Sequence, residues 1–272
     1  MPSLEGSQTI KEGVSEMNHS ITFGEKNTWD DWHLVSQVRP FFAPPALKTK
    51  HVDIPGASGF LDLSESLTGY PVYNNREGSF EFIILNDYGE WYDIYSEIMN
   101  YLSGGGAQRA ILEDERDFFY EGKFWVSDYK PGSSASEPWS TITISYSVNP
   151  YKWALQSTAD DWEWDTFSFH SGIIRSALFK RIDVDTDGWV EKVYNSNEFG
   201  TAPVYPNIIV DSTDGGGMDI HFVNGNLGID VTKHLSDGEH MDSDFIFYGP
   251  EAVRIKFSGH GNVTIDFRIG RL

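Results

Sequence analysis

The sequence contains no cysteine, which excludes disulfide bridges, cysteine-based zinc sites and thiol catalysis. It is also poor in basic residues, because 20 Lys and Arg stand against 41 Asp and Glu, for a formal net charge of −21. Such a charge argues against direct nucleic-acid recognition, which needs a basic surface, and against binding to anionic lipid. The longest plain aliphatic run, residues 82–85, is far shorter than the ~20 residues of a membrane helix, so we expect no membrane insertion.

Residues 1–17 are polar and contain no apolar segment, so they lack the pattern of a secretory signal. We expect them to form a flexible leader, with Met17 as an alternative start, on a soluble chain made in the cytoplasm.

Aromatic residues are abundant: they make up 15% of the 272 residues and include nine Trp. This composition suits two domains, and it requires much surface to be covered by the fold itself or by partners.

The first half of the chain predicts strands, one helix and a hairpin. Residues 80–85 fit a short buried strand, and Asp87 and Glu90 then match the capping box of a helix. Glycines at 104–106 end this helix, whose apolar face is formed by Trp91, Ile94, Tyr95, Ile98, Met99 and Leu102. Residues 122–126 and 141–148 alternate as the two strands of a hairpin, the second with one buried face and one hydroxyl-rich face.

The second half is predicted to be almost entirely β. Asn149 and Pro150 end the preceding strand, because proline cannot continue a ladder, and the domain boundary is placed close behind them. Asn224-Gly225 is a strong hairpin signal, and residues 259–261 fit a turn. Strands spaced by about ten residues predict a β-sandwich or jelly roll; the alternating runs lie at residues 167–169, 204–210, 220–222, 227–231, 253–257 and 263–269.

The common catalytic motifs are absent from the sequence. There is no His-Glu-x-x-His, no Gly-x-Ser-x-Gly, no P-loop and no dinucleotide-binding glycine motif after a strand. We therefore expect a protein that is not an enzyme and that has no cofactor, unless it binds calcium.

Asp183, Asp185, Asp187 and Gly188 match the first half of an EF-hand calcium loop, in which alternate carboxylates converge on the ion. The twelfth position of such a loop is Tyr194 here, where a bidentate Glu is required. The flanking residues fit strands rather than paired helices. The three aspartates are thus candidate calcium ligands, and the alternative is an acidic turn between two strands.

Residues 160–165 combine acids with tryptophans at Trp162 and Trp164. Carboxylates beside aromatic rings suit a glycosidase cleft, yet six contiguous residues say nothing about an opposed catalytic pair. These two tryptophans are candidates for stacking on a glycan. The alternative is a linker whose rings pack within the protein.

The stretch Phe23-Gly-Glu-Lys-Asn-Thr-Trp-Asp-Asp-Trp-His-Leu34 resembles the opening of distal tail proteins (Dit) of long-tailed siphophages and related prophages. The resemblance continues in consistent order to residue 153. Its clearest segments are Val52-Asp-Ile-Pro-Gly56, Leu61-Asp-Leu-Ser-Glu-Ser-Leu-Thr-Gly69, Pro71-Val-Tyr-Asn-Asn-Arg76 and Val148-Asn-Pro-Tyr-Lys-Trp153. Residues 261–272 also look like a Dit C-terminus, so the resemblance is more specific than any single motif.

The resemblance implies a mainly β chain of two domains behind the leader at residues 1–17. Residues 18–152 would form the ring-forming (belt) domain, a β-sandwich with one α-helix and a β-hairpin. Residues 153–272 would form a galectin-like or jelly-roll β-sandwich. A chain of 272 residues has room for these two domains and not for an inserted carbohydrate-binding module.

The same resemblance implies a structural role in the virion tail tip, assembled in the bacterial host cytoplasm. Six copies would form a homohexameric ring, the baseplate hub around a DNA channel. The ring would join the tail tube protein to a tail-associated (Tal-like) tip protein, with receptor-binding proteins as further partners. Six copies at −21 each carry −126, so we expect carboxylates to line the channel and repel DNA phosphates.

Contacts between subunits are expected to come from aromatic residues in the proline- and turn-rich part of the first domain. These candidates are Trp29, Trp32, Phe41, Phe42, Tyr70 and Tyr73. Arg76 is added because it could pair with an acid across an interface. For each of them, ordinary packing within the subunit is the alternative.

Two other functions compete with the hub. A module that binds host cell-wall glycans would use Trp162, Trp164 or Trp189, and burial of these rings would argue against it. A tail-associated hydrolase would need a catalytic constellation, and the sequence shows none.

Overall fold

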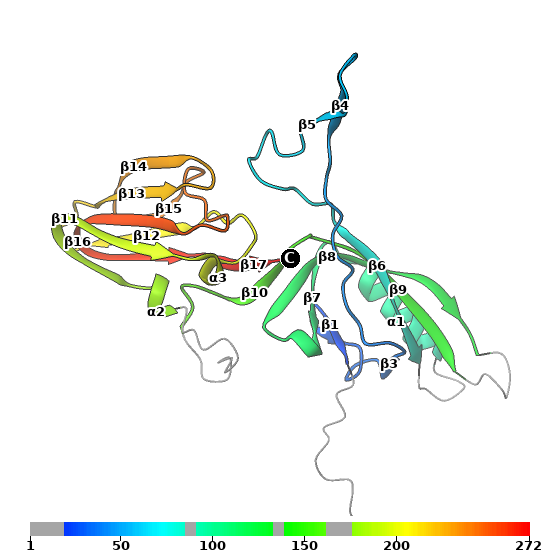
Figure 1. Cartoon of the computed structure of the whole chain (residues 1–272). Coiled ribbons are helices and arrows are strands. Elements are labelled where there is room, and N and C mark those ends of the chain that lie inside the picture. Colours follow the sequence, from blue (N-terminus) through cyan, green and yellow to red (C-terminus); the bar gives the residue numbers. More distant parts are fainter. Residues whose placement is uncertain (1–18, 85–90, 133–138, 162–175) are drawn as a thin grey trace, which may run out of the picture. The chain divides into compact units, whose positions relative to one another are not determined.

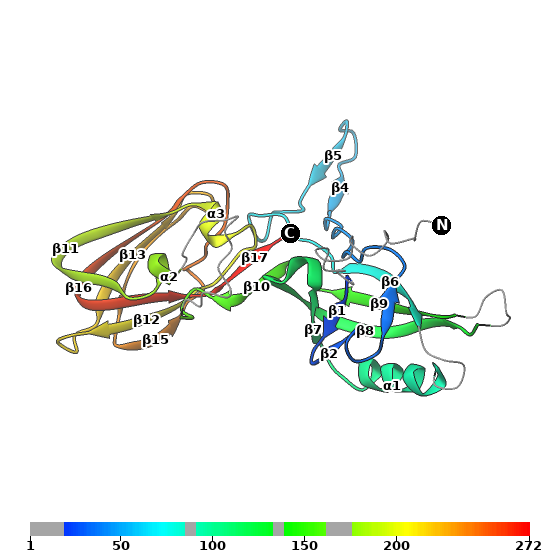
Figure 2. The same cartoon turned by 90° about the horizontal axis from the view of Figure 1, so that it is seen from below.

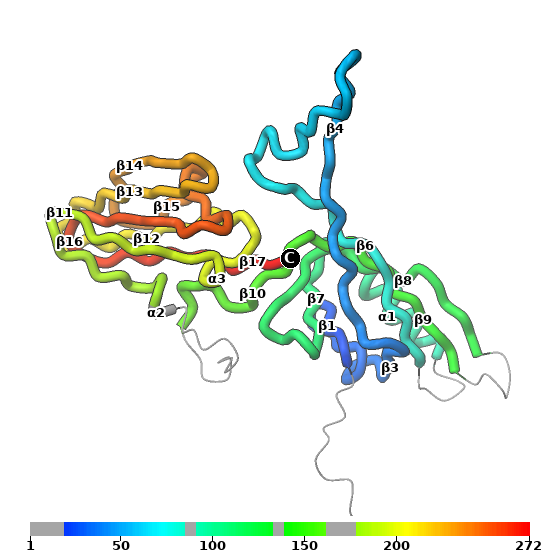
Figure 3. Tube along the Cα trace, in the orientation of Figure 1, coloured from blue at the N-terminus to red at the C-terminus, as the bar shows by residue number. Residues whose placement is uncertain are grey.

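The computed structural model describes residues 19–84, 91–132, 139–161 and 176–272 (Figures 1 and 3). The fold is mainly β, with two curled sheets. Two compact units make up the chain: one comprises Met1–Phe41, Ser79–Glu115 and Phe124–Ser145, the other Phe42–Gly78, Arg116–Lys123 and Tyr146–Leu272. The division between residues 152 and 153 that the sequence predicts stays a prediction.

Within the described residues, nine strands form the first sheet. Its order is β2-β1-β7-β8-β9-β6-β3, and β10 pairs with both β8 and β17. The strands are β1 (Ile21–Phe23), β2 (Lys26–Asn27), β3 (Leu34–Ser36), β6 (Arg76–Ile84), β7 (Gln108–Leu112), β8 (Phe118–Lys130), β9 (Ser140–Val148), β10 (Lys152–Ser157) and β17 (Arg268–Arg271). A short 3₁₀ turn, Glu113–Glu115, follows β7. The predicted hairpin is confirmed, because β8 and β9 are neighbours in this sheet.

Strand β9 shows how the sequence alternation becomes a two-faced strand. Ile142, Ile144 and Tyr146 are buried, whereas Thr143 and Ser145 between them are half-buried. The hydroxyl groups bond within the sheet, since Ser145 Oγ donates to Ser127 Oγ at 2.7 Å. The strand ends at Val148, directly before Asn149 and Pro150, as predicted.

Helix α1 (Trp91–Ser103) lies along the sheet near β8 and β9, as Figure 2 shows. Ile98 and Leu102 are buried on the helix face that the apolar spacing predicts, whereas Met99, assigned to the same face, is 42% exposed. The rings of Trp91 and Tyr95 lie against Tyr129 of β8, with centroids 5.2 and 4.6 Å away. The predicted capping residues Asp87 and Glu90 lie outside the described residues.

The second sheet has six strands in the described part of the chain. Its order is β14-β13-β16-β12-β15, and β11 pairs with β16. The strands are β11 (Ile182–Tyr194), β12 (Asn207–Ser212), β13 (Met218–Asn224), β14 (Ile229–Leu235), β15 (Gly238–Met241) and β16 (Val253–Asp266). Two four-residue helices, α2 (Ser176–Phe179) and α3 (Ser196–Phe199), accompany them.

Buried aromatic rings fill the core beside this second sheet. Phe247 is fully buried and stacks on Phe267 with ring centroids 5.2 Å apart. Phe179 meets Tyr194 in a second stack at 4.6 Å, and burial raises the pKa of Tyr194. This core accounts for part of the aromatic excess within the subunit itself.

Strand β16 corrects one sequence prediction. Residues 259–261 were expected to form a turn between two strands, but they lie inside one continuous strand that pairs with β11 along both halves. Gly259 and Gly261 have φ of 137° and 142°, values that L side chains rarely adopt. A Cβ on Gly261 would lie 2.2 Å from the carbonyl oxygen of Asp211, so glycine allows the strands to approach here.

The hairpin predicted at Asn224-Gly225 is present, but the return strand begins at Ile229 and excludes Leu227. The cause is the buried side chain of Asn224, whose Nδ2 donates to the carbonyl oxygens of Ile246 and Tyr248 at 2.8 and 3.0 Å. Its Oδ1 accepts from the backbone N–H of Asn226 at 3.0 Å. The asparagine thus holds a longer turn than the two-residue turn expected.

None of the helices in the described ranges is long and apolar enough to cross a membrane. The predicted run at residues 167–169 lies outside these ranges.

Candidate functional site

Residues 46–74 form a segment that we call the arm. Its hairpin pairs β4 (His51–Asp53) with β5 (Phe60–Asp62), which lie side by side in Figure 2. At its root, the N–H of Lys48 donates to the carbonyl oxygen of Val72 at 2.7 Å, and the N–H of Asn74 donates to that of Ala46 at 2.8 Å. The two ends of the arm are therefore held together by backbone hydrogen bonds.

The arm exposes apolar side chains along most of its length. All six residues of β4 and β5 are exposed, and Phe60 and Leu61 keep 59% and 46% of their surface accessible. The other exposed apolar residues of the arm are Leu47, Val52, Ile54, Leu63 and Leu67. An isolated two-stranded hairpin is at best marginally stable in water, so a surface that covers this one would stabilise it.

The arm differs in charge from the rest of the chain. Two lysines, Lys48 and Lys50, stand against Asp53, Asp62 and Glu65, a net charge of −1 in a chain of −21. Both lysines are exposed. The arm can therefore approach an acidic surface with little like-charge repulsion. The rest of this acidic chain would be repelled by such a surface more strongly.

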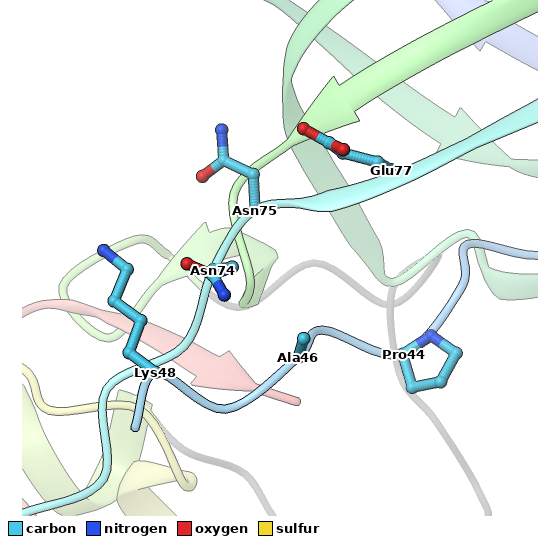
Figure 4. A pocket seen from close by; sticks show the side chains of 6 residues that line it. All are labelled: Pro44, Ala46, Lys48, Asn74, Asn75 and Glu77. Carbon is cyan, nitrogen blue, oxygen red and sulfur yellow. The ribbon is translucent and has the colours of Figure 1, made fainter. Parts of the chain in front are cut away.

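A polar pocket of about 560 Å³ lies at the root of the arm (Figure 4). It is lined by Pro44, Ala46, Lys48, Asn74, Asn75 and Glu77. An ammonium group, two amides and a carboxylate give it mixed polarity and no preference for either sign of charge.

Two of the predicted interface residues, Phe42 and Arg76, meet in a buried cluster beside the arm. Phe42 stacks on Tyr120 with ring centroids 4.0 Å apart, and the guanidinium of Arg76 lies 5.5 Å from the same ring. Arg76 Nε donates to the carbonyl oxygen of Pro150 at 2.8 Å, and Nη1 donates to that of Ala43 at 3.1 Å. Both side chains are about 5% exposed, so each packs inside the subunit.

Tyr70 and Tyr73 are half-buried and lie near other tyrosines. The ring of Tyr70 is 4.7 Å from that of Tyr248, and Tyr73 is 6.0 Å from Tyr151. The pKa of Tyr70 is raised to about 12, mainly by burial and to a smaller extent by a hydrogen bond with Tyr205. The Tyr70 phenol therefore remains neutral at physiological pH, and the ring contacts of both tyrosines fix the returning end of the arm.

The remaining predicted interface residues are Trp29, Trp32 and Phe41. Trp32 is fully buried and donates from Nε1 to Glu97 at 3.2 Å, and Trp29 is half-buried with its ring 6.2 Å from that of His33. Phe41, in contrast, is 67% exposed. Of the six aromatic candidates, Phe41 is thus the one whose side chain is mostly accessible in the single chain, and their interface roles stay predictions.

The predicted calcium ligands lie in β11, which is extended. In a strand, side chains two residues apart are separated by about 6.6 Å along the chain, so they do not converge as in a calcium loop. Asp185 and Asp187 instead flank His260 of β16: Asp185 lies 2.7 Å from Nδ1 and Asp187 lies 3.2 Å from Nε2. Among the described residues, no three His, Asp or Glu side chains gather as a metal site. Calcium binding by Asp183, Asp185 and Asp187 stays a prediction.

The two carboxylates are expected to make His260 a stronger base. Hydrogen bonds to Asp185 and then Asp187 raise the pKa of His260 above 6.5. The pKa of His260 is higher in the folded protein than in the unfolded chain, so the pairing with the carboxylates stabilises the fold below pH 6.5. This stabilisation is lost as the pH rises through the folded pKa.

An NMR titration of the His260 imidazole should show that Asp185→Asn lowers this pKa. Asp183→Asn, which removes a carboxylate not bonded to His260, should leave it unchanged, and equal effects of the two variants would contradict the assignment.

The glycan candidates Trp162 and Trp164 lie outside the described residues.

The sequence alone does not identify the arm as an exposed apolar surface. A signal was present: two short apolar runs, residues 52–54 and 60–63, flank Pro55, Gly56 and Gly59, the pattern of a hairpin. That pattern does not show that both faces of the hairpin are exposed to solvent.

No protein-family model matches the chain, and no curated protein matches it. Among solved structures, the chain is similar to the SPP1 Dit protein, which is described as a paradigm of the hub adsorption apparatus in Gram-positive infecting phages. That match has a TM-score of 0.57 and 12% sequence identity, and it covers 92% of this chain and 98% of that chain.

Two structures of the phage p2 baseplate in its activated conformation also match, each at 10% identity over 85% of this chain and 90% of that chain. Their TM-scores of 0.32 and 0.33 are too low to support a conclusion. The likeness to SPP1 Dit, at its low identity, shows the fold alone. The fold class predicted from the sequence, a mainly β chain with the two-domain β-sandwich fold of a distal tail protein, is therefore confirmed.

Proposed function

We propose that this chain is a structural hub protein of a phage tail tip. Six copies would form a ring around the DNA channel and join the tail tube protein to a tail-associated (Tal-like) tip protein. The observation that carries the proposal is a fold shared with SPP1 Dit over 92% of the chain. The role needs no catalytic residues, and the proposal assigns none.

The arm supports a second copy of this chain as its occupant. Its exposed apolar side chains need a cover, and its net charge of −1 lets it approach a neighbour of −21. Lys48 and Lys50 would then face carboxylates of that neighbour. Because every subunit carries both an arm and an acidic surface, head-to-tail contacts of this kind can close a ring.

The high negative charge of the chain would also serve a role around the DNA channel. Six copies carry −126, and carboxylates facing the channel would repel DNA phosphates and let the DNA pass. Receptor-binding proteins are further proposed partners at the outside of the hub.

The mass of the purified protein in solution tests the ring. Light scattering coupled to gel filtration should give six times 30.7 kDa, about 184 kDa. Moderate salt should favour this species, because salt screens repulsion between acidic subunits. A mass of about 30.7 kDa at every protein concentration would contradict the proposal.

A further inference from the structure

The solvent face of the second sheet has a row of four polar side chains. Glu191 of β11 lies opposite Lys256 of β16, which lies opposite His221 of β13, which lies opposite Thr232 of β14. Residues directly opposite each other in register share a face. Three spacings of about 4.8 Å give this row a length of about 14 Å.

The other face of the two central strands of the row, β13 and β16, is apolar and buried. Ile220, Phe222, Ile255 and Phe257 alternate with the row and are fully buried. The polar row is therefore presented to solvent on a rigid sheet, which is a better support for a ligand than a loop.

An exposed indole ring stands beside this row. Trp189 is 49% exposed, and its ring centroid is 6.0 Å from that of His221 at 66°. It lies where the register between β11 and β16 shifts, between Thr186 and Val190. Such bulges re-aim side chains and are common beside functional sites.

The polar groups of the row are held in place by partners. His221 Nε2 lies 2.7 Å from Asp230 Oδ1, and Lys256 Nζ lies 3.9 Å from Glu191 Oε1. The bond to Asp230 fixes the imidazole ring, and among the described residues no hydrogen-bond partner occupies Nδ1. Lys256 offsets Glu191, and Asp230 adds a carboxylate beside His221, so the face has no excess positive charge to attract an anion.

We infer that this face binds an uncharged oligosaccharide. A sugar ring presents C–H groups on one side, which stack on an indole, and hydroxyl groups at its edge, which suit carboxylate, imidazole and hydroxyl partners. The polar groups around Trp189 differ from the apolar centre typical of a protein interface. Such a site would let the protein contact surface glycans whether or not it forms a ring.

The full-length protein on an array of immobilised neutral oligosaccharides, with uronic-acid and phosphate-bearing glycans in parallel, tests this inference. We expect binding to a neutral class, weakened about tenfold by Trp189→Ala, the equivalent of roughly 1.4 kcal/mol. Trp189→Phe should retain part of the binding, because a smaller ring still stacks. Trp125→Ala is the matched control, since Trp125 is 41% exposed on β8 of the other sheet, and it should bind as the wild type does.

Three results would overturn the inference: no neutral glycan bound, binding unchanged in Trp189→Ala, or binding to the anionic glycans alone. Circular dichroism of each variant keeps a folding defect separate from a lost contact. The solution mass of Trp189→Ala is expected to equal that of the wild type, so failure of this site and failure of the ring are distinguishable.

Discussion

Replacing Phe60 and Leu61 with serine is expected to convert the six-copy assembly into monomers while each chain stays folded. Both side chains are about half exposed in the single chain, so their loss costs the subunit little. Fully burying an exposed apolar side chain contributes about 1.5–3 kcal/mol, and a neighbour can cover only the exposed half of each of these two, so each contact between subunits loses about 1.5–3 kcal/mol. The affinity per contact then falls by about 10- to 10²-fold.

Light scattering measures whether the six-copy assembly is lost, and thermal unfolding measures whether each chain stays folded. Met241→Ser is the control, because Met241 is 79% exposed and lies outside the arm. It should leave the six-copy mass unchanged. An intact assembly in the Phe60, Leu61 double variant would show that the arm is not the contact between copies.

Arg76→Met is expected to destabilise the chain by about 3 kcal/mol or more. The guanidinium donates to the carbonyl oxygens of Pro150 and Ala43, and hydrogen bonds from a charged donor contribute about 1.5–3 kcal/mol each. Methionine keeps much of the volume and removes both donors. Because Ala43 and Arg76 flank the two ends of the arm, the variant should also loosen its root.

Urea denaturation followed by circular dichroism measures the loss. Arg76→Lys should restore little, since a single ammonium group does not match the fork of the guanidinium. Arg39→Met is the control: the side chain of Arg39 is 64% exposed and pairs with Asp114, a surface contact contributing at most about 1 kcal/mol. Equal stability of Arg76→Met and Arg39→Met would contradict the role assigned to Arg76.

Local periodicity predicted the elements whose burial depends on near neighbours. Helix α1 buries Ile98 and Leu102 on the predicted face, and β9 alternates as its hydroxyl and apolar residues indicated. The turn expected at residues 259–261 failed for a nonlocal reason. Gly261 is needed because the paired strand β12 approaches it closely at Asp211, and a sequence pattern does not show which segment pairs with it.

The surfaces were harder to predict than the fold. Aromatic residues outside regular periodicity were chosen as interface candidates, yet Trp32 and Phe42 are buried beside Glu97 and Tyr120. The exposed apolar residues of the arm lie in short runs that resemble ordinary strands. Whether such a run is covered depends on long-range packing. Trp189 and His221 are 32 positions apart, and only the pairing of β11 and β13 with β16 brings them together.

Negative-stain electron microscopy of the purified protein, alone and with a tail tube protein, shows whether six copies form a ring. We expect closed rings with six-fold symmetry around a central channel, and stacking of these rings on the tube. Single particles without rings at high protein concentration, in both samples, would contradict this expectation.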